Sequence, residues 1–147
     1  MKFNLIIDST KEEAITATVC KRSELTDQIE ALVLSYTGDN KLSAYTPDEM
    51  IQLPFDRIEC ITVLSGKTYA IDTKGTHYRL KQRLYELEGK LPSVFIRINK
   101  STLANETRLE RFITTYSGAV NARFLCGYED YVSRRCFTTI KRRYDTK

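Results

Sequence analysis

The sequence has no tryptophan, a single histidine and no apolar run long enough to cross a membrane. Its longest apolar stretches, Leu5–Ile7 and Ala31–Leu34, are far shorter than the roughly 20 residues of a membrane helix or the core of a signal peptide. His77 alone cannot build a metal site of several histidines, and it is the one candidate base for a catalytic triad. These absences predict a cytoplasmic protein without a metal.

Phosphate-binding motifs are also absent. No G-x-G-x-x-G occurs, and Ser65-Gly66-Lys67-Thr68 ends like a phosphate loop but has Ile61 where the first glycine belongs. Such a loop also requires a helix directly after it, whereas this segment is predicted to lie between two strands. We therefore predict no enzymatic activity and no cofactor.

The four cysteines, Cys20, Cys60, Cys126 and Cys136, form no C-x-x-C pair. This spacing does not match a zinc site or a disulfide-exchange motif. We interpret them as reduced thiols that pack as small apolar side chains. A redox-sensitive Cys126/Cys136 pair is the alternative.

The chain has 147 residues, which predicts one main domain with a modest appendage. Charge is divided unevenly along it. Residues 1–78 contain 8 basic and 12 acidic side chains, a net charge of −4, whereas residues 79–147 contain 15 basic and 7 acidic ones, a net charge of +8. The basic half favours a polyanionic partner, nucleic acid before membrane, and a merely solvated basic surface is the alternative.

Residues 1–40 have a pattern of their own. The β-forming residues of Lys2–Asp8 and the alternation of Ile15, Ala17 and Val19 with polar residues predict a hairpin. Ser23 then precedes an amphipathic helix with apolar residues at Leu25, Ile29, Leu32, Val33 and Tyr36. We predict a small N-terminal extension, with a role in dimerisation or regulation, before a domain over residues 41–147.

From Lys41 onward the pattern is that of short strands separated by turns. The predicted strands are 41–45, 50–53, 58–64, 68–72, 76–80, 94–98, 109–115, 120–126 and 129–132, and residues 100–105 are predicted to form a turn. Leucines 80, 84, 87 and 91 predict one helix, and a basic helix begins at about Arg134. The fold class is therefore mainly β with a few helices (α+β).

Five segments then occur in a recognisable order: Phe55–Ile61, Ser65–Tyr69, Leu84–Glu88, Phe95–Ser101 followed by Asn105, and Val132–Arg135. Their order and spacing over residues 54–144 resemble a LytTR-type DNA-binding domain. The most specific part is an F-x-R-x-x-K-S-x-x-x-N strand and turn combined with V-S-R-R at the start of the last helix.

The resemblance implies an elongated β-rich fold of three small sheets that reads DNA through loops in successive major grooves. It implies a sequence-specific regulator of transcription like a response regulator, but with only about 40 residues in the place of a receiver domain. The alternative function is a non-catalytic adaptor whose basic half meets an acidic protein or anionic surface.

Carried over to this sequence, the resemblance predicts DNA contacts at three places: Lys67 and Thr68, then Asn99, Lys100 and Ser101, then Ser133, Arg134 and Arg135, with Arg142 added from the basic helix. Some members have histidine where Thr68 and Asn99 stand, so base preferences are not transferred. The planar Arg135 side chain can bond guanine O6 and N7. Asn99 either reads adenine or caps its turn, and Arg97 is expected to pair with Glu59 or Glu110.

The resemblance also implies partners. They are double-stranded promoter DNA with direct repeats, a second copy of the chain at least on DNA, a membrane protein that holds the regulator inactive, and RNA polymerase. The mildly acidic N-terminal helix is a candidate docking or dimerising face.

Overall fold

The computed structural model describes residues 2–12, 14–37 and 40–145 and divides into two compact units, residues 1–39 and 40–147. In the first unit, helix α1 (Glu24–Thr37) begins where the sequence predicts it. Ser23 caps the helix, since its hydroxyl faces the Thr26 amide while the Thr26 hydroxyl accepts from the Ser23 amide at 2.9 Å. The predicted hairpin is not there: residues 2–12 and 14–23 form no strand.

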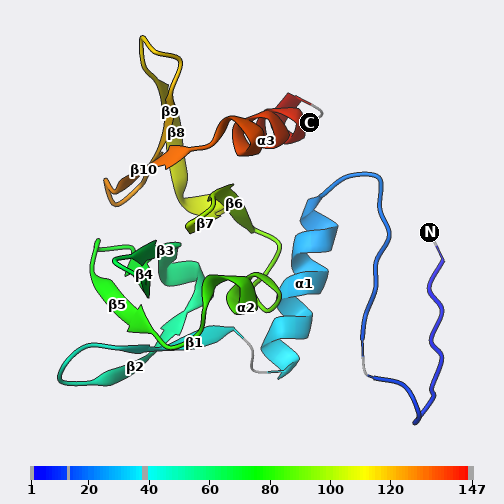
Figure 1. The fold of residues 1–147 in the computed structure, drawn as a ribbon. Helices are drawn as coiled ribbons and strands as arrows, with labels where there is room; N and C mark the ends of the chain where they lie inside the picture. Colours follow the sequence, from blue (N-terminus) through cyan, green and yellow to red (C-terminus); the bar gives the residue numbers. More distant parts are fainter. Residues whose placement is uncertain (1, 13, 38–39, 146–147) are drawn as a thin grey trace. The chain divides into compact units, whose positions relative to one another are not determined.

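The second unit contains ten strands, two helices and two single 3₁₀ turns (Figure 1). Its strands are β1 (Lys41–Tyr45), β2 (Met50–Pro54), β3 (Ile58–Leu64), β4 (Lys67–Asp72), β5 (His77–Leu80), β6 (Phe95–Asn99), β7 (Thr102–Asn105), β8 (Leu109–Thr114), β9 (Val120–Phe124) and β10 (Glu129–Val132). Its helices are α2 (Leu84–Glu88) and α3 (Arg134–Asp145), and the 3₁₀ turns are η1 (Phe55–Arg57) and η2 (Glu106–Arg108). None of the helices described is long and apolar enough to span a membrane.

The strands form two antiparallel sheets rather than the three that the resemblance implies. One sheet has the order β2-β1-β5-β4-β3-β7-β6 and the other β10-β9-β8. The difference lies in a single residue pair, because only Tyr45 and Arg79 join the β1–β2 ribbon to β5. The ribbon is therefore counted with the larger sheet although its pairing to that sheet is minimal.

Strand β7 is the main addition to the predicted pattern. Residues 102–105 form a strand in the interior of the large sheet, between β3 and β6, and all four are buried. The sequence signal is weak because the strand has four residues and two of them, Thr102 and Asn105, are polar. Inside the sheet the Thr102 hydroxyl bonds that of Thr62 at 2.8 Å, so the polar strand is accommodated by a polar neighbour.

The large sheet is buried on both faces because its strands alternate between two cores. Ile61, Ala70 and Leu103 are paired neighbours across three strands, and they belong to a core that also contains Leu84 and Leu87 of α2. Their sequence neighbours contribute to a second core with the small sheet and α3; its fully buried members are Cys60, Ile71, Ile98, Ala104, Ala122 and Phe124. Helix α3 and the small sheet are thus packed against the same face.

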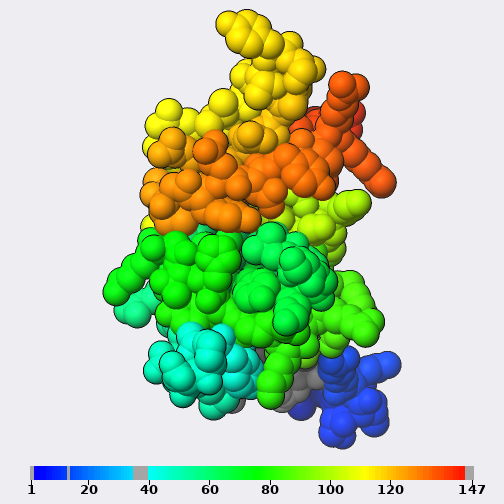
Figure 2. All heavy atoms as spheres, turned by 60° about the vertical axis from the view of Figure 1, so that its left-hand side comes forward, coloured from blue at the N-terminus to red at the C-terminus, as the bar shows by residue number. Residues whose placement is uncertain are grey.

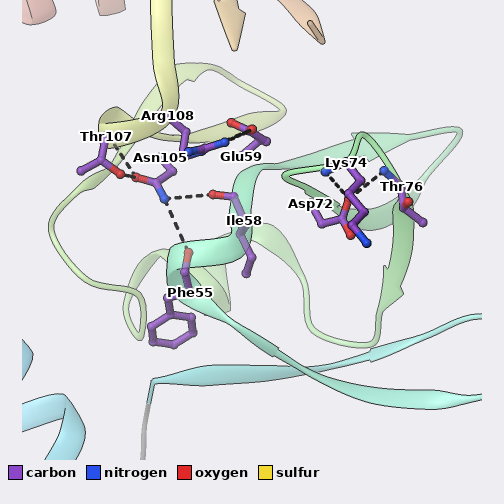
Figure 3. Close-up of polar contacts among 9 residues, drawn as sticks. All are labelled: Phe55, Ile58, Glu59, Asp72, Lys74, Thr76, Asn105, Thr107 and Arg108. Atoms are coloured by element: carbon purple, nitrogen blue, oxygen red, sulfur yellow. Dashed lines mark hydrogen bonds and ion pairs between the residues drawn. The ribbon is translucent and has the colours of Figure 1, made fainter. Parts of the chain in front are cut away.

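The passage from the large to the small sheet is held by buried polar side chains (Figure 3). Asn105 Nδ2 donates to the Ile58 carbonyl at 2.9 Å, and its Oδ1 accepts from the Thr107 amide at 3.1 Å. Next to it, Arg108 Nη2 lies 3.0 Å from Glu59 Oε1 in β3, where the Glu59 side chain has no exposed surface. These contacts fix η2, and with it the start of β8.

Candidate nucleic-acid interface

The β3–β4 corner is a two-residue turn that projects Lys67. Leu64 and Lys67 close the ladder, and the central residues Ser65 and Gly66 have φ values of 52° and 76°. Positive φ at both positions is the geometry of a type I′ hairpin, which matches strand twist. Lys67 is exposed, whereas Thr68 is only 8% exposed and pairs with Val63. The structure leaves Lys67 open for contact and holds Thr68 within the sheet.

The β6–β7 turn is organised by Asn99. The Asn99 side chain is fully buried, with its Oδ1 accepting from the Ser101 amide and its Nδ2 donating to the Tyr131 carbonyl, both at 2.8 Å. Both ends of the buried amide are therefore hydrogen-bonded within the protein, which fits the turn-capping alternative. Lys100 at the tip is exposed and Ser101 is half-buried.

Arg97 of β6 hydrogen-bonds to the same turn. Its Nη1 donates to the Lys100 carbonyl at 2.8 Å, and its Nη2 pairs with the Glu88 carboxylate of α2. The expected partners were wrong, because Glu59 is held by Arg108 and Glu110 pairs with Arg111 and Arg123. The physical reason is that Glu88 is the last residue of α2, and local sequence does not reveal where this helix lies relative to β6.

Ser133 begins α3 and anchors it. Its amide donates to the Ile98 carbonyl at 2.9 Å, and its hydroxyl accepts from the Cys136 amide at 3.2 Å, which makes it the helix N-cap. Arg134 and Arg135 follow in the first turn and are exposed. A helix N-terminus is electropositive, so cations there cost roughly 0.3–1 kcal/mol rather than stabilise the helix. These two arginines are therefore not explained by helix stability.

The three segments are joined by hydrogen bonds to backbone groups. The Val63 amide next to the β3–β4 corner donates to the Ser101 carbonyl at 2.9 Å, and Ile98 and Asn99 bond Ser133 and Tyr131 as described. A surface groove of about 830 Å³ lies between the β6–β7 turn and α3; its lining includes Arg97, Asn99, Lys100, Tyr131, Ser133, Arg135, Thr139 and Arg143. The structure thus brings Asn99 and Lys100 together with Ser133 and Arg135 in one groove, whose lining does not include Ser101 or Arg134. The first segment is linked to Ser101 through Val63, which pairs with Thr68.

Arg142 lies further along α3, seven residues after Arg135, and is exposed. Residues at this spacing share a helix face and are about 10 Å apart along the axis. Its neighbour Arg143 pairs with Glu106 of η2 at 2.9 Å. Arg142 therefore extends the face that starts at Arg135, while Arg143 contributes to docking the helix.

Tyr131 is a groove residue that is absent from the predicted contacts, because the sequence predicts residues 129–132 only as a strand. It is 48% exposed, and it lines the groove described above as well as a second one, of about 890 Å³, against the β8–β9 hairpin. The signal was available: in a strand, the neighbour of the buried Val132 points outward. Figure 2 shows the hairpin tip (yellow) as a narrow projection beyond the orange surface of β10 and α3.

His77 and the four cysteines are the other residues that the sequence analysis singles out for their chemistry. Among the described residues no three His, Cys, Asp or Glu side chains are placed to hold a metal ion. His77 is exposed at the start of β5, where it bonds the Gly75 carbonyl and contacts the rings of Tyr69 and Tyr128. All four cysteines are free thiols, and burial raises the pKa of Cys60 and of Cys126.

Comparison with known proteins is consistent with this geometry. Residues 48–145 match the family described as LytTr DNA-binding domain. Two Staphylococcus aureus proteins, from strains bovine RF122 / ET3-1 and NCTC 8325 / PS 47, are each 30% identical over 144 residues, which is 97% of this chain and 97% of theirs. Both are described as uncharacterized HTH-type transcriptional regulators.

A solved LytTr DNA-binding domain from Bacillus cereus has the same fold, with a TM-score of 0.65 and 21% identity over 71% of this chain and 96% of that one. A helix-turn-helix needs two helices joined by a short turn. In the part of the chain that the structure describes, strands separate α1, α2 and α3 from one another. The fold therefore follows the domain match rather than the helix-turn-helix description, and the chain belongs to the LytTR family of DNA-binding domains.

Proposed function

We propose that the protein is a sequence-specific, double-stranded DNA-binding regulator of transcription that reads successive major grooves through loops. Family membership supports DNA binding, and the description of the Staphylococcus aureus relatives supports a role in transcription. The observation that carries the proposal is the hydrogen-bonded junction of the β3–β4 corner, the β6–β7 turn and the start of α3, each of which presents an exposed basic side chain.

The exposed side chains take two roles in this proposal. Arg135 reads a base, because its planar guanidinium can bond guanine O6 and N7 together, a contact that discriminates by about 1–3 kcal/mol. Arg134 and Ser101 lie beside the groove contacts. Lys67, Lys100 and Arg142 neutralise phosphates, where each charge adds about 0.9 to the salt slope of binding.

Three of the predicted contact residues become positioning residues instead. Thr68 is buried in the ladder, and Asn99 is buried between the turn and β10. The amide and hydroxyl of Ser133 are hydrogen-bonded to Ile98 and Cys136. Each orients a neighbour that remains exposed: Lys67, Lys100 and Arg134. The proposed function therefore expects substitutions at these three sites to act on DNA binding through the fold.

We further infer that the regulator binds promoter direct repeats as a homodimer and acts on transcription by RNA polymerase. A membrane protein that sequesters it is the proposed inhibitor, with residues 1–40 as its docking region. Among these partners, DNA is the one that family membership supports.

The test is selection of bound fragments from sheared genomic DNA with the wild type, with Arg135→Ala, and with Arg57→Ala as a control that removes an exposed arginine elsewhere. The proposal expects a repeated motif enriched by the wild type and by the control but lost by Arg135→Ala. Equal, motif-free recovery by all three would favour the adaptor alternative, in which the basic surface meets any polyanion.

A further inference from the structure

The segment Lys2–Ile7 has the sequence of a strand but no partner strand among the described residues. Its apolar side chains are among the most exposed of the chain, with Phe3 at 88%, Leu5 at 74%, Ile6 at 85% and Ile7 at 89% exposure. Exposed apolar side chains that adjoin one another in this way mark interaction surfaces in folded proteins. An unpaired strand also leaves its backbone donors and acceptors available for pairing.

The turn that follows this segment is formed. The Lys11 amide donates to the Asp8 carbonyl at 3.2 Å, and the Thr10 amide and hydroxyl both donate to Asp8 Oδ1, at 3.0 and 2.6 Å. A second strand-like segment with Ile15 and Val19, both exposed, comes after it. A hydrogen-bonded turn thus separates the two strand-like segments. Two strands alone are only marginally stable in water, and a stable sheet needs three or more. No further strand is present among the described residues of this unit.

The segment is complementary to itself when two copies run antiparallel with Leu5 opposite Leu5. In that register Lys2 faces Asp8, and Phe3 faces Ile7. Opposite charges and large apolar pairs at directly facing positions each stabilise an antiparallel ladder. Phe3, Leu5 and Ile7 then lie on one face, since side chains alternate along a strand. A shift by one residue would lose the charge pair and move these residues to the other face.

We propose that residues 2–8 pair with the same segment of a second copy of this chain, around a two-fold axis at Leu5. Two-fold symmetry turns the single Lys2–Asp8 match into two such pairs and uses one surface on both partners. The strand-like segments that contain Ile15 and Val19, one from each copy, then extend the ladder to four strands with an apolar face. The occupant is a second copy because the charge pattern fits the segment's own sequence read in reverse.

The pairing lies within the N-terminal unit and does not depend on DNA. This pairing supplies the interface of the homodimer in the proposed function, on which it rests. The pairing is tested without DNA, so a negative result would leave the DNA-binding proposal standing. A dimer formed in this way carries two DNA-binding domains before any promoter is met.

Disulfide trapping in the full chain tests the register. In a Cys20→Ser background, Leu5→Cys places two cysteines across the axis, where facing Cα atoms are about 4.5–5.5 Å apart and a disulfide is geometrically allowed. Asn4→Cys is the matched control, because residue 4 faces residue 6 and the two introduced cysteines lie beyond the roughly 7 Å limit. Diamide should convert Leu5→Cys to a crosslinked dimer at least tenfold faster than Asn4→Cys.

Analytical ultracentrifugation of the reduced protein gives a second readout. Lys2→Asp puts like charges opposite each other twice per dimer and should weaken self-association several-fold, whereas Lys11→Asp makes the same charge change outside the paired segment and should not. A monomeric wild type, equal crosslinking of the two cysteine variants, or equal association of the two aspartate variants would each overturn the proposal.

Discussion

Asn99 Nδ2 donates a hydrogen bond of 2.8 Å to the backbone carbonyl of Tyr131, and this contact joins the β6–β7 turn to the strand that leads into α3. The same side chain holds the Ser101 amide. A buried amide that satisfies two backbone groups fixes how far apart Lys100 and Arg135 stand. The spacing of the proposed DNA contacts thus depends on a residue that does not reach the surface.

Replacing Asn99 by alanine should therefore cost stability first. The variant loses both hydrogen bonds and leaves the Tyr131 carbonyl and the Ser101 amide without these partners, at a cost of up to about 1–3 kcal/mol for each group that water does not reach. Urea unfolding measures this loss. Lys100→Ala at the exposed neighbour is the control and should unfold like the wild type; equal stability of all three proteins would remove Asn99 from its positioning role.

Lys67 and Lys100 should contribute to DNA binding without contributing to sequence preference. Each neutralises a phosphate in the proposal, so Lys67→Gln and Lys100→Gln should each reduce the slope of log K against log salt by about 0.9. Lys74→Gln is the matched control, because Lys74 is an exposed lysine just past the opposite end of β4. Fluorescence anisotropy at several salt concentrations measures the slopes, and a loss that depends on the DNA sequence would contradict the phosphate role.

The ion pair between the buried Glu59 and the half-buried Arg108 predicts a non-additive effect on stability. Arg108→Met leaves the Glu59 carboxylate buried with no partner, which typically destabilises by about 3–5 kcal/mol. Glu59→Leu combined with Arg108→Met removes the buried charge as well and should recover much of the loss. Denaturant unfolding of the single and double variants checks this; a double variant less stable than Arg108→Met would show that the pair is not the source.

Tyr128 predicts how stability changes at alkaline pH. Burial raises the pKa of Tyr128 to about 12, above the usual value of 10.0. As pH rises past 10, the unfolded chain releases this proton before the folded one does, so the free energy of unfolding falls between pH 10 and 12. Tyr128→Phe should show a shallower decline over that window. Melting temperatures at pH 9, 10 and 11 compare the two proteins. Parallel curves of melting temperature against pH would contradict a raised pKa of Tyr128 in the folded protein.

Much of the fold could be predicted because its signals are local. Strands β1, β3 and β10 have the predicted bounds, since alternation between apolar and polar residues and nearby turn residues define them. Helix α3 begins at Arg134 as predicted because Ser133 is a capping residue directly before an amphipathic stretch. Lys67, Lys100 and Arg135 are exposed, as loop and helix-surface positions require.

The parts that could not be predicted depend on contacts distant in sequence. Strand β7 exists because β3 and β6 flank it, and Arg97 pairs with Glu88 because α2 lies beside β6. Burial of Asn99 depends on Tyr131, which is 32 residues away. The predicted N-terminal hairpin was wrong although its local pattern is strand-like, because residues 2–12 and 14–23 form no strand.

Arg135 carries the central claim, so the most direct measurement compares its contribution on two DNA sequences. Titrate the wild type, Arg135→Ala and the control Arg57→Ala with a duplex carrying the selected motif and with one in which the motif is scrambled, at one salt concentration. We expect Arg135→Ala to lose about 1–3 kcal/mol on the motif and far less on the scrambled duplex, while the control binds both like the wild type. An equal loss on the two duplexes would contradict base reading by Arg135. It would mean that the basic surface attracts DNA electrostatically without regard to sequence.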